Sequence, residues 1–349
     1  MKLSMMLNYS GDSKAAADEV VALEKAGVEA VWVPEAYSFD AISMMGYLAA
    51  KTTSMEIGSA IVNVFSRTPT LLAMSAAGLD YVSGGRINFG LGASGPQVIE
   101  GFHGVPYEAP MTKIRETIEV CRQVWRREVI NYQGKTIHIP LPEGQGTGLA
   151  KPLKLINHPV RGNIPLYWAS LKGKSVEATA EVADGWIPIF YIPELADRVW
   201  GDAISLGTKK RGASLGKLDI LAGGAVAIGD DLPIDTLLDM GRKQTALYVG
   251  GMGARGKNFY NDILSAYGWE AEAKLVQDLY LDGNKTEAEA ALPAEYLRMG
   301  SLIGPEGYVR DRLAAYVEAG VTYFQAGLFG TLEQKLATVE QLRKIIDDL

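Results

Sequence analysis

The chain has 349 residues, of which 48% are hydrophobic and 21% are charged, a balance typical of a soluble globular protein with a large core. Its formal net charge of -7 argues against nucleic acid or an anionic membrane as a partner, and its single cysteine, Cys121, excludes an intrachain disulfide and a cysteine-based zinc site. Because no apolar run reaches transmembrane length and the N-terminus lacks the apolar region of a signal peptide, we expect a cytoplasmic protein without a membrane span.

Short apolar runs of strand length alternate with helical patterns along the chain. The pattern predicts strands at about residues 2–9, 29–34, 56–62, 86–91, 164–168, 185–190, 218–228 and 321–326. It predicts helices at residues 13–26, 40–51, 69–83, 175–183 and 331–349. Eight strands in βα alternation over this length favour an α/β fold of the TIM (β/α)8 barrel type over a doubly wound sheet. We therefore predict one domain over residues 1–349.

Two segments do not fit the eightfold pattern. Residues 130–163 contain a hairpin-like stretch and then a loop rich in glycine and proline, and residues 231–303 are mostly helical. We place both after strands, and the loops that follow strands build the active-site face of a barrel. We therefore expect both segments to be insertions at the C-terminal face that shape the mouth of the barrel.

Residues 55–69 form the most informative local stretch. It begins as a β-branched strand and then brings Asn63, Ser66 and Arg67 together before a threonine–proline pair opens a helix. The small residues 58–60 would let a flat ring lie close to the backbone. The stretch predicts the floor of a cofactor site, although a core strand followed by a capped helix would leave the same pattern.

Two loops at predicted strand ends carry groups suited to a ligand. Residues 170–175 place a glycine and two lysines at the start of a helix, so backbone N–H groups and positive charge converge there. This pattern predicts an anion site for a phosphate, and a solvated lysine pair on an ordinary turn is the alternative. The glycine-dense loop at 90–96 fits either close approach of the backbone to a ligand or a simple turn.

Motifs for other chemistries have little support. Residues 251–256 match the G-x-G-x-x-G fingerprint but follow a helical pattern inside an insertion, which disfavours a dinucleotide site. No G-x-S-x-G elbow is present, and His103, His138 and His158 lie in separate loops without metal-ligand spacing, so we predict no metal site. His103 follows closely after the loop at 94–97, and we expect it to line the mouth as a candidate catalytic residue.

Five stretches carry a resemblance to a known family. They are AVWVPEAYSFD, IGSAIVNVFSRTP, SAAGLDYVSGGRINFGLGASGPQVIEGFHG, WASLKGKSVEATAEVADGWIP and GPEGYVRDRLAAYVEAGVTYF. In these stretches, which span nearly the whole chain, the sequence resembles the luciferase-like monooxygenase family. Within that family it resembles the oxidoreductases that use the deazaflavin coenzyme F420. The third stretch is the most specific of the five.

The resemblance implies a TIM barrel with a deazaflavin lying across the C-terminal ends of the strands. By position it implies a non-proline cis peptide between Ala60 and Ile61, in a bulge that backs the central ring. Glu35 falls where relatives place an acidic residue near the ring. Several relatives have Asp-His at this point, with the histidine near the reactive carbon. Here the pair is Glu35-Ala36, so that acid–base role is vacant or has moved.

The resemblance also assigns contacts to the cofactor. Asn63, Ser94 and Gln97 fall where relatives contact the ring or its side chain, and Asn63 and Glu35 are candidates for handling a proton or orienting a group. The phosphate would be held by Ala169, Ser170, Leu171, Lys172, Gly173 and Lys174. This assignment agrees with the anion site that the helix start predicts on its own.

Three hypotheses about function follow. The first is an F420-dependent oxidoreductase that transfers a hydride, the second an FMN-dependent monooxygenase on the same barrel, and the third a binder that kept the fold without catalysis. Tyr191, Trp200, Phe259 and Tyr260 favour an organic substrate of more than a few carbons, although such residues also cover barrel cores. We expect a homodimer or a higher homo-oligomer.

Overall fold

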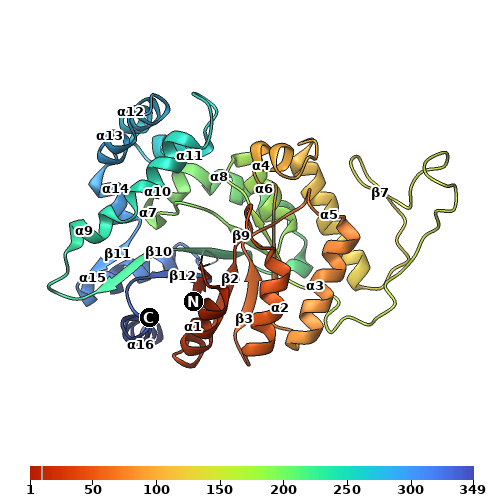
Figure 1. Ribbon diagram of the computed structural model, residues 1–349, viewed down its shortest axis with the longest axis horizontal. Helices are drawn as coiled ribbons and strands as arrows, with labels where there is room; N and C mark the ends of the chain where they lie inside the picture. Colours follow the sequence, from red (N-terminus) through yellow and green to blue (C-terminus); the bar gives the residue numbers. More distant parts are fainter. Residues whose placement is uncertain (9–10) are drawn as a thin grey trace.

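The chain folds into a closed barrel of parallel strands surrounded by helices (Figure 1). The structure is a computed structural model, and it describes residues 1–8 and 11–349. Within these residues, eight parallel strands follow one another around the barrel and the last pairs with the first. They are β1 (Lys2–Met6), β2 (Ala30–Val33), β3 (Glu56–Ser59), β5 (Ile87–Gly92), β8 (Leu166–Ala169), β9 (Gly185–Ile187), β10 (Asp219–Ile228) and β12 (Tyr323–Leu328). The predicted TIM barrel is confirmed.

The predicted strands agree with the observed ones to within a few residues. The strand expected at 2–9 ends at Met6, and its last expected residue, Tyr9, lies outside the described residues. Shorter strands are β4 (Val62–Asn63), β6 (Tyr132–Gln133), β7 (His138–Ile139) and β11 (Leu302–Gly304). Strand β11 pairs with the end of β10 and was not predicted, because three residues are too short for a periodic pattern.

Helices cover the outside of the barrel, as a parallel sheet requires. Those that follow the barrel strands are α1 (Ser13–Lys25), α2 (Ala41–Lys51), α3 (Pro69–Ser83), α4 (Pro96–Gly101), α5 (Pro110–Trp125), α6 (Gly173–Val182), α7 (Pro193–Ala196), α8 (Asp202–Lys210), α15 (Glu306–Glu318) and, after the last strand, α16 (Leu332–Asp347). A π-helical turn, Asp197–Gly201, joins α7 to α8. Local sequence fixes the ends: Thr68 caps α3 at the backbone N–H of Leu71, and Thr331 and Gln334 form a capping box at the start of α16.

Aromatic rings fill the barrel interior beneath the strand ends. Trp32 lies beside Gly58 in the strand register, and a Cβ on that glycine would sit 2.2 Å from the indole ring. Tyr167 lies in the same way beside Gly185, again at 2.2 Å. The two rings meet edge to face at 5.0 Å. Gly58 therefore serves core packing instead of making room for a ligand ring, which corrects our interpretation of that residue.

The first expected insertion, residues 130–163, is not at the mouth. It follows α5 instead of a strand, and its antiparallel hairpin β6–β7 packs beside that helix, where Glu116 accepts a hydrogen bond from the Thr136 N–H at 2.9 Å. Its later part reaches the end of α3, where Arg161 pairs with Asp80. Helices of a βα barrel end at the N-terminal face of the strands. The expectation that this segment shapes the mouth was wrong, as its place at the right of Figure 1 also shows.

The second insertion does follow a strand. After β10 it forms α9 (Ile234–Asp239), α10 (Arg242–Ala246), a π-helical turn (Leu247–Gly251), α11 (Phe259–Ala266), α12 (Glu270–Leu281), α13 (Lys285–Ala290) and α14 (Ala294–Met299) before β11. The G-x-G-x-x-G match at 251–256 lies in this segment and follows helical turns, as the sequence indicated. In the described part of the chain, no helix is long and apolar enough to cross a membrane.

Candidate active site

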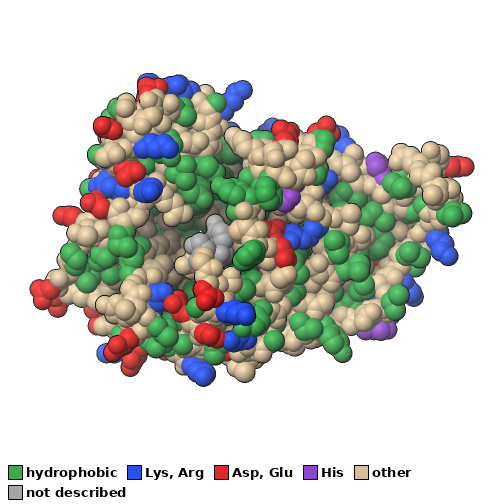
Figure 2. Space-filling view, in the orientation of Figure 1, with side chains coloured by type: hydrophobic (Ala, Val, Ile, Leu, Met, Phe, Trp, Pro, Cys, Tyr) green, Lys and Arg blue, Asp and Glu red, His purple; other side chains and the backbone are tan. Residues whose placement is uncertain are grey.

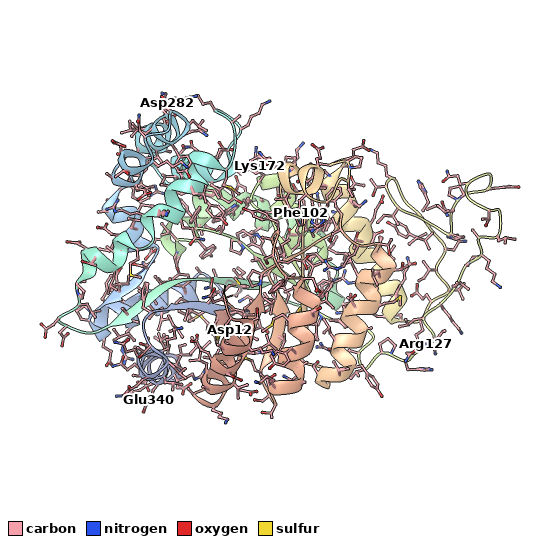
Figure 3. All side chains as sticks on the ribbon, in the orientation of Figure 1. Asp12, Phe102, Arg127, Lys172, Asp282 and Glu340 are labelled. Carbon is pink, nitrogen blue, oxygen red and sulfur yellow. The ribbon has the colours of Figure 1, made fainter. Side chains whose placement is uncertain are left out.

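The mouth of the barrel is hollowed. Figure 2 shows the hollow below the second insertion, with hydrophobic side chains along its upper border. In Figure 3, Lys172 and Phe102 lie at this end of the molecule, whereas Arg127, just past the end of α5, lies at the other. The loops after β5 and β8 therefore lie at one face, and Tyr37 in the loop after β2 contacts Phe102 there at 6.4 Å between ring centroids.

A bulge interrupts the third barrel strand at the mouth. The chain leaves β3 at Ser59, passes through a cis peptide between Ala60 and Ile61, and resumes pairing with β5 as β4. The cis bond that the resemblance implied is thus present. The Ser59 hydroxyl replaces ladder bonds here: it donates to the Gly90 carbonyl at 2.9 Å and accepts from the Gly90 N–H at 2.8 Å. Ala60 is partly exposed and packs on the Trp32 layer, so the bulge presents a small side chain to the mouth.

Asn63 and His103 come together although 40 residues separate them. Nδ2 of Asn63 lies 3.5 Å from Nε2 of His103. The other end of the amide is committed, because Oδ1 accepts from the N–H groups of Phe65 and Ser66 at 3.0 and 2.8 Å. Asn63 is buried and His103 is half-buried. The amide is therefore held rigidly, and its Nδ2 can orient the half-buried imidazole.

Glu35 is engaged in a buried ion pair. Its two carboxylate oxygens accept from Nη1 and Nη2 of Arg67 at 2.8 Å each, and one of them also accepts from the Ala41 N–H at 2.9 Å. The side chains of Glu35 and Arg67 are only 7% and 16% exposed. The hydrogen bonds that Arg67 donates to Glu35 raise the pKa of Arg67 above its ordinary value, against the effect of burial. This geometry suits a group that holds the β2–α2 loop and the start of α2.

Asp40 is a second carboxylate close to the Arg67 guanidinium. Its carboxylate lies 3.8 Å from Nη2 of Arg67 and caps α2 at the backbone N–H of Ser43. Burial acts to raise the pKa of Asp40, but the hydrogen bonds from Ser43 and the Arg67 charge outweigh it and hold that pKa below its usual range. Arg67, which the sequence placed near the site without a role, is thus the residue that joins the β2 loop to the β4 loop.

The Ser94–Gln97 loop follows β5, where Gly92 pairs with Asn63 in the strand register. Ser94 has a φ of 57°, in the left-handed region, and its carbonyl accepts from the Tyr107 hydroxyl at 3.0 Å. Burial raises the pKa of Tyr107, so that the hydroxyl remains a donor. Ser94 and Gln97 are themselves exposed, Gln97 at the first turn of α4. Both remain available to a ligand that enters the mouth.

The predicted phosphate loop combines one buried and several exposed residues. Ser170 is buried and its hydroxyl lies 2.8 Å from that of Thr179, whereas Ala169 and Leu171 are half-buried. Lys172, Gly173 and Lys174 are exposed. Because α6 begins at Gly173, its first N–H groups have no acceptor within the helix and are free to bind an anion.

The two lysines of this loop have different surroundings. Lys172 Nζ lies 4.1 Å from the ring centroid of Phe259 and 3.8 Å from a carboxylate oxygen of Asp262, both in α11. Lys174 instead lines a cavity of about 340 Å³ on the outer surface, beside Arg115 and Glu181. The structure therefore keeps Lys172 at the mouth and places Lys174 between α5 and α6. A second outer-surface cavity, of about 270 Å³, lies against α3.

Aromatic side chains of the second insertion line the mouth more extensively than the sequence indicated. Phe190, which follows β9 with a φ of 53°, contacts the rings of Tyr248, Tyr260 and Tyr296 at 5.9, 6.0 and 6.3 Å between centroids. Burial raises the pKa of Tyr260 to about 12, so it stays neutral at physiological pH. Only Tyr260 of this cluster was singled out from sequence, because aromatics carry no signal of which face they line.

These residues fit a phosphorylated flavin-like cofactor. A small side chain at the Ala60 bulge leaves space for a flat ring over the Trp32 layer, and the start of α6 with Lys172 supplies donors and charge for a phosphate. Among the described residues, no group of three or more His, Cys, Asp or Glu is placed to hold a metal ion.

The fold and these strand-end groups define a TIM barrel with a candidate cofactor site at its C-terminal face. The sequence profile of the luciferase-like monooxygenases matches residues 1–323, and the chain belongs to this family. A Mycobacterium tuberculosis protein, named provisionally as a coenzyme F420-dependent oxidoreductase, is 37% identical over 92% of this chain and 93% of its own.

Solved structures agree on the fold. The coenzyme F420-dependent tetrahydromethanopterin reductase of Methanopyrus kandleri has a TM-score of 0.77 at 21% identity, covering 98% of this chain and 96% of its own. An F420-dependent secondary alcohol dehydrogenase, solved with an F420–acetone adduct, has a TM-score of 0.74 at 15% identity and covers 99% and 98%.

Proposed function

We propose that this protein is an F420-dependent oxidoreductase that transfers a hydride between the deazaflavin and an organic substrate. The observation that carries the proposal is the meeting, at one mouth, of the Ala60 bulge and the start of α6. The first offers a surface for a ring and the second offers donors for a phosphate. The names of the mycobacterial relative and of the two solved structures support F420 over other flavin-like cofactors.

The chain's own residues then have distinct roles. When bound, F420 supplies a ring carbon that takes up or gives a hydride. Ala60 and Ile61 back the ring, Ser94 and Gln97 contact the cofactor from the exposed loop after β5, and residues 169–174 hold the phosphate. His103 is the residue suited to give or take a proton at the substrate oxygen, because it is half-buried beside Asn63, whose amide can orient the imidazole.

Because Glu35 is engaged in an ion pair, we assign it a structural role in holding the neighbouring loop. Both carboxylate oxygens are occupied by Arg67 and Ala41, so the group holds the loop that borders the ring. Ala36 stands where several relatives have a histidine and cannot transfer a proton. We therefore assign the proton-handling role to His103. The aromatic cluster of Phe190, Tyr248 and Tyr260 suits a substrate with a large apolar part.

Cofactor affinity and the fate of oxygen test this function. Purified protein is titrated with F420 and with FMN by fluorescence, and then assayed with a panel of alcohols, ketones and enones. We expect tighter binding of F420, and turnover that consumes no oxygen. Tighter binding of FMN with oxygen consumption would establish the luciferase-like monooxygenase instead. Binding of F420 without turnover on any substrate class would favour a non-catalytic binder.

We also propose a homodimer formed through the outer face of α3. The exposed large side chains of this helix are Leu71, Met74, Tyr81 and Val82, at 46%, 52%, 69% and 64%. Its charged residue, Asp80, is buried. The neighbouring loop adds Ile156 at 88% exposure, and Leu155 of that loop lines one cavity together with Met74, Tyr81 and Val82. A second copy is the occupant we expect, because an apolar helix without charge suits self-association.

Light scattering on a sizing column tests the dimer. The wild-type chain should elute at twice its 37.6 kDa mass. Met74→Glu should shift it toward the monomer, whereas Met240→Glu, on a methionine 63% exposed outside this patch, should not. A wild-type protein that elutes as a monomer at micromolar concentration would contradict the proposal.

A further inference from the structure

Two tryptophans anchor the loop that begins the phosphate site. Nε1 of Trp186, in β9, donates to the Ser170 carbonyl at 2.9 Å, and Nε1 of Trp200, in the π-helical turn, donates to the Leu171 carbonyl at 2.9 Å. The two indoles are 0% and 1% exposed. Two consecutive peptide groups of the loop are thus fixed by side-chain donors from inside the protein.

Peptide geometry converts these bonds into an orientation of N–H groups. In a trans peptide the C=O and N–H point in opposite directions. Because the carbonyls of Ser170 and Leu171 point at the tryptophans, the N–H groups of Leu171 and Lys172 point away from them. The Lys172 N–H already donates to the Ser175 hydroxyl at 3.2 Å, which tightens the turn into α6. The loop therefore presents the Leu171 N–H on the side opposite the indole pair, next to the first N–H groups of the helix.

The indole pair is itself held by a packed aromatic box. The rings of Trp186 and Trp200 meet edge to face at 5.2 Å, and Tyr191 stacks parallel to Trp200 at 5.9 Å. Tyr267, at the end of α11, lies against Trp200 at 6.2 Å and donates its hydroxyl to the Phe190 carbonyl at 2.9 Å. The box joins the loop to β9, to the π-helical turn and to the second insertion, so the carbonyls cannot turn without disturbing the packing of several elements.

We propose that Trp186 and Trp200 are positioning residues for the cofactor phosphate, and that their indole N–H groups hold the 170–172 peptides so that the Leu171 N–H and the start of α6 face the anion. The inference rests on the proposed function, since it needs a phosphorylated ligand at this loop. Neither indole contacts that ligand. The contribution is preorganisation: the N–H groups are already oriented when the phosphate arrives, so little ordering is needed on binding.

The test compares two ligands that differ only in the phosphate, ribityl deazaflavin and its 5′-phosphate. Their dissociation constants for the full chain are measured by fluorescence titration, without turnover. Trp200→Phe and Trp186→Phe each keep an aromatic ring and remove one donor. Each should reduce the preference for the phosphorylated ligand by about fivefold, the loss expected for one hydrogen bond, while affinity for the unphosphorylated ligand changes little.

Trp125→Phe is the matched control. Trp125 is 1% exposed and its Nε1 donates to the Ala73 carbonyl at 2.9 Å, so the same substitution removes an equivalent buried bond between α5 and α3, away from the mouth. It should lower stability as much as the other variants and leave the phosphate preference unchanged. If Trp200→Phe does not fold, Trp186→Phe makes the same test.

The outcomes separate this inference from the proposed function. A wild-type chain that prefers the phosphorylated ligand, with variants that keep this preference within about twofold, would overturn the positioning role alone. A wild-type chain that binds neither ligand, or binds both equally, would overturn the phosphate site and the inference with it. An equal loss of preference in Trp125→Phe would show a general effect of destabilisation and would also overturn the proposal.

Discussion

Replacing Arg67 by methionine should destabilise the protein by about 3 kcal/mol, because it leaves a buried carboxylate without its counter-charge. Glu35 is 7% exposed and accepts from both terminal nitrogens of Arg67 at 2.8 Å. Removing one partner of a buried pair costs roughly 3–5 kcal/mol, since the remaining charge stays desolvated. The lower end applies here, because Arg67 is 16% exposed and the Ala41 N–H still donates to Glu35.

A second substitution distinguishes the lost charge pairing from lost packing. In Arg67→Met with Glu35→Gln, the buried carboxylate is removed and only Asp40, whose side chain is 47% exposed, loses a charged partner, so the double variant should recover about 1 kcal/mol or more relative to Arg67→Met alone. The control is Arg126→Met. Arg126 pairs with Glu128 at the surface, with the two side chains 50% and 46% exposed, and its loss should cost less than about 0.5 kcal/mol.

Urea unfolding at neutral pH, followed by circular dichroism, measures these free energies. If Arg67→Met and Arg126→Met cost the same, the Glu35 carboxylate is reached by water and the reasoning from burial is refuted. The double variant also tests the role of Glu35. If it folds, binds F420 and keeps most of its turnover, Glu35 holds the loop and does not transfer a proton.

Other predictions concern the mouth. His103→Gln should lower turnover roughly a hundredfold with F420 affinity unchanged. The control His138→Gln, in the hairpin beside α5, should leave turnover unchanged. Equal losses of turnover in the two variants would show that His103 has no catalytic role. Lys172→Glu should weaken F420 binding by about threefold to tenfold, and the loss should be larger at low salt. Lys174→Glu should weaken F420 binding less, because that side chain lines the outer cavity. A larger loss in Lys174→Glu than in Lys172→Glu would place the phosphate elsewhere. Ala60→Leu should abolish F420 binding in a folded barrel, because a larger side chain would fill the space above the bulge, and a dissociation constant within about threefold of wild type would contradict that placement.

The barrel was readable from the sequence because its signals are local. Each strand is a short apolar run and each helix a periodic pattern with its own cap, so the chain neighbours of a residue are enough to assign it. The cis peptide between Ala60 and Ile61 and the loop at the start of α6 were placed by the resemblance and by the helix-start pattern. Their chemistry lies in the backbone, which the local sequence largely determines.

Side-chain partnerships across the barrel were decided only by the tertiary structure. Glu35 meets Arg67 across 32 residues, and the carbonyl of Leu171 meets Trp200 across 29. In the sequence, Gly58 was interpreted as space for a ligand, but the fold places the Trp32 ring against it. From the sequence, the segment at 130–163 was expected to form part of the mouth, but it follows α5 and packs beside that helix. A pattern of neighbouring residues specifies which face of an element is apolar. Which distant group a polar side chain or a glycine contacts depends on the register of the strands and on where the loops cross. Only the folded chain determines that register and those loop positions.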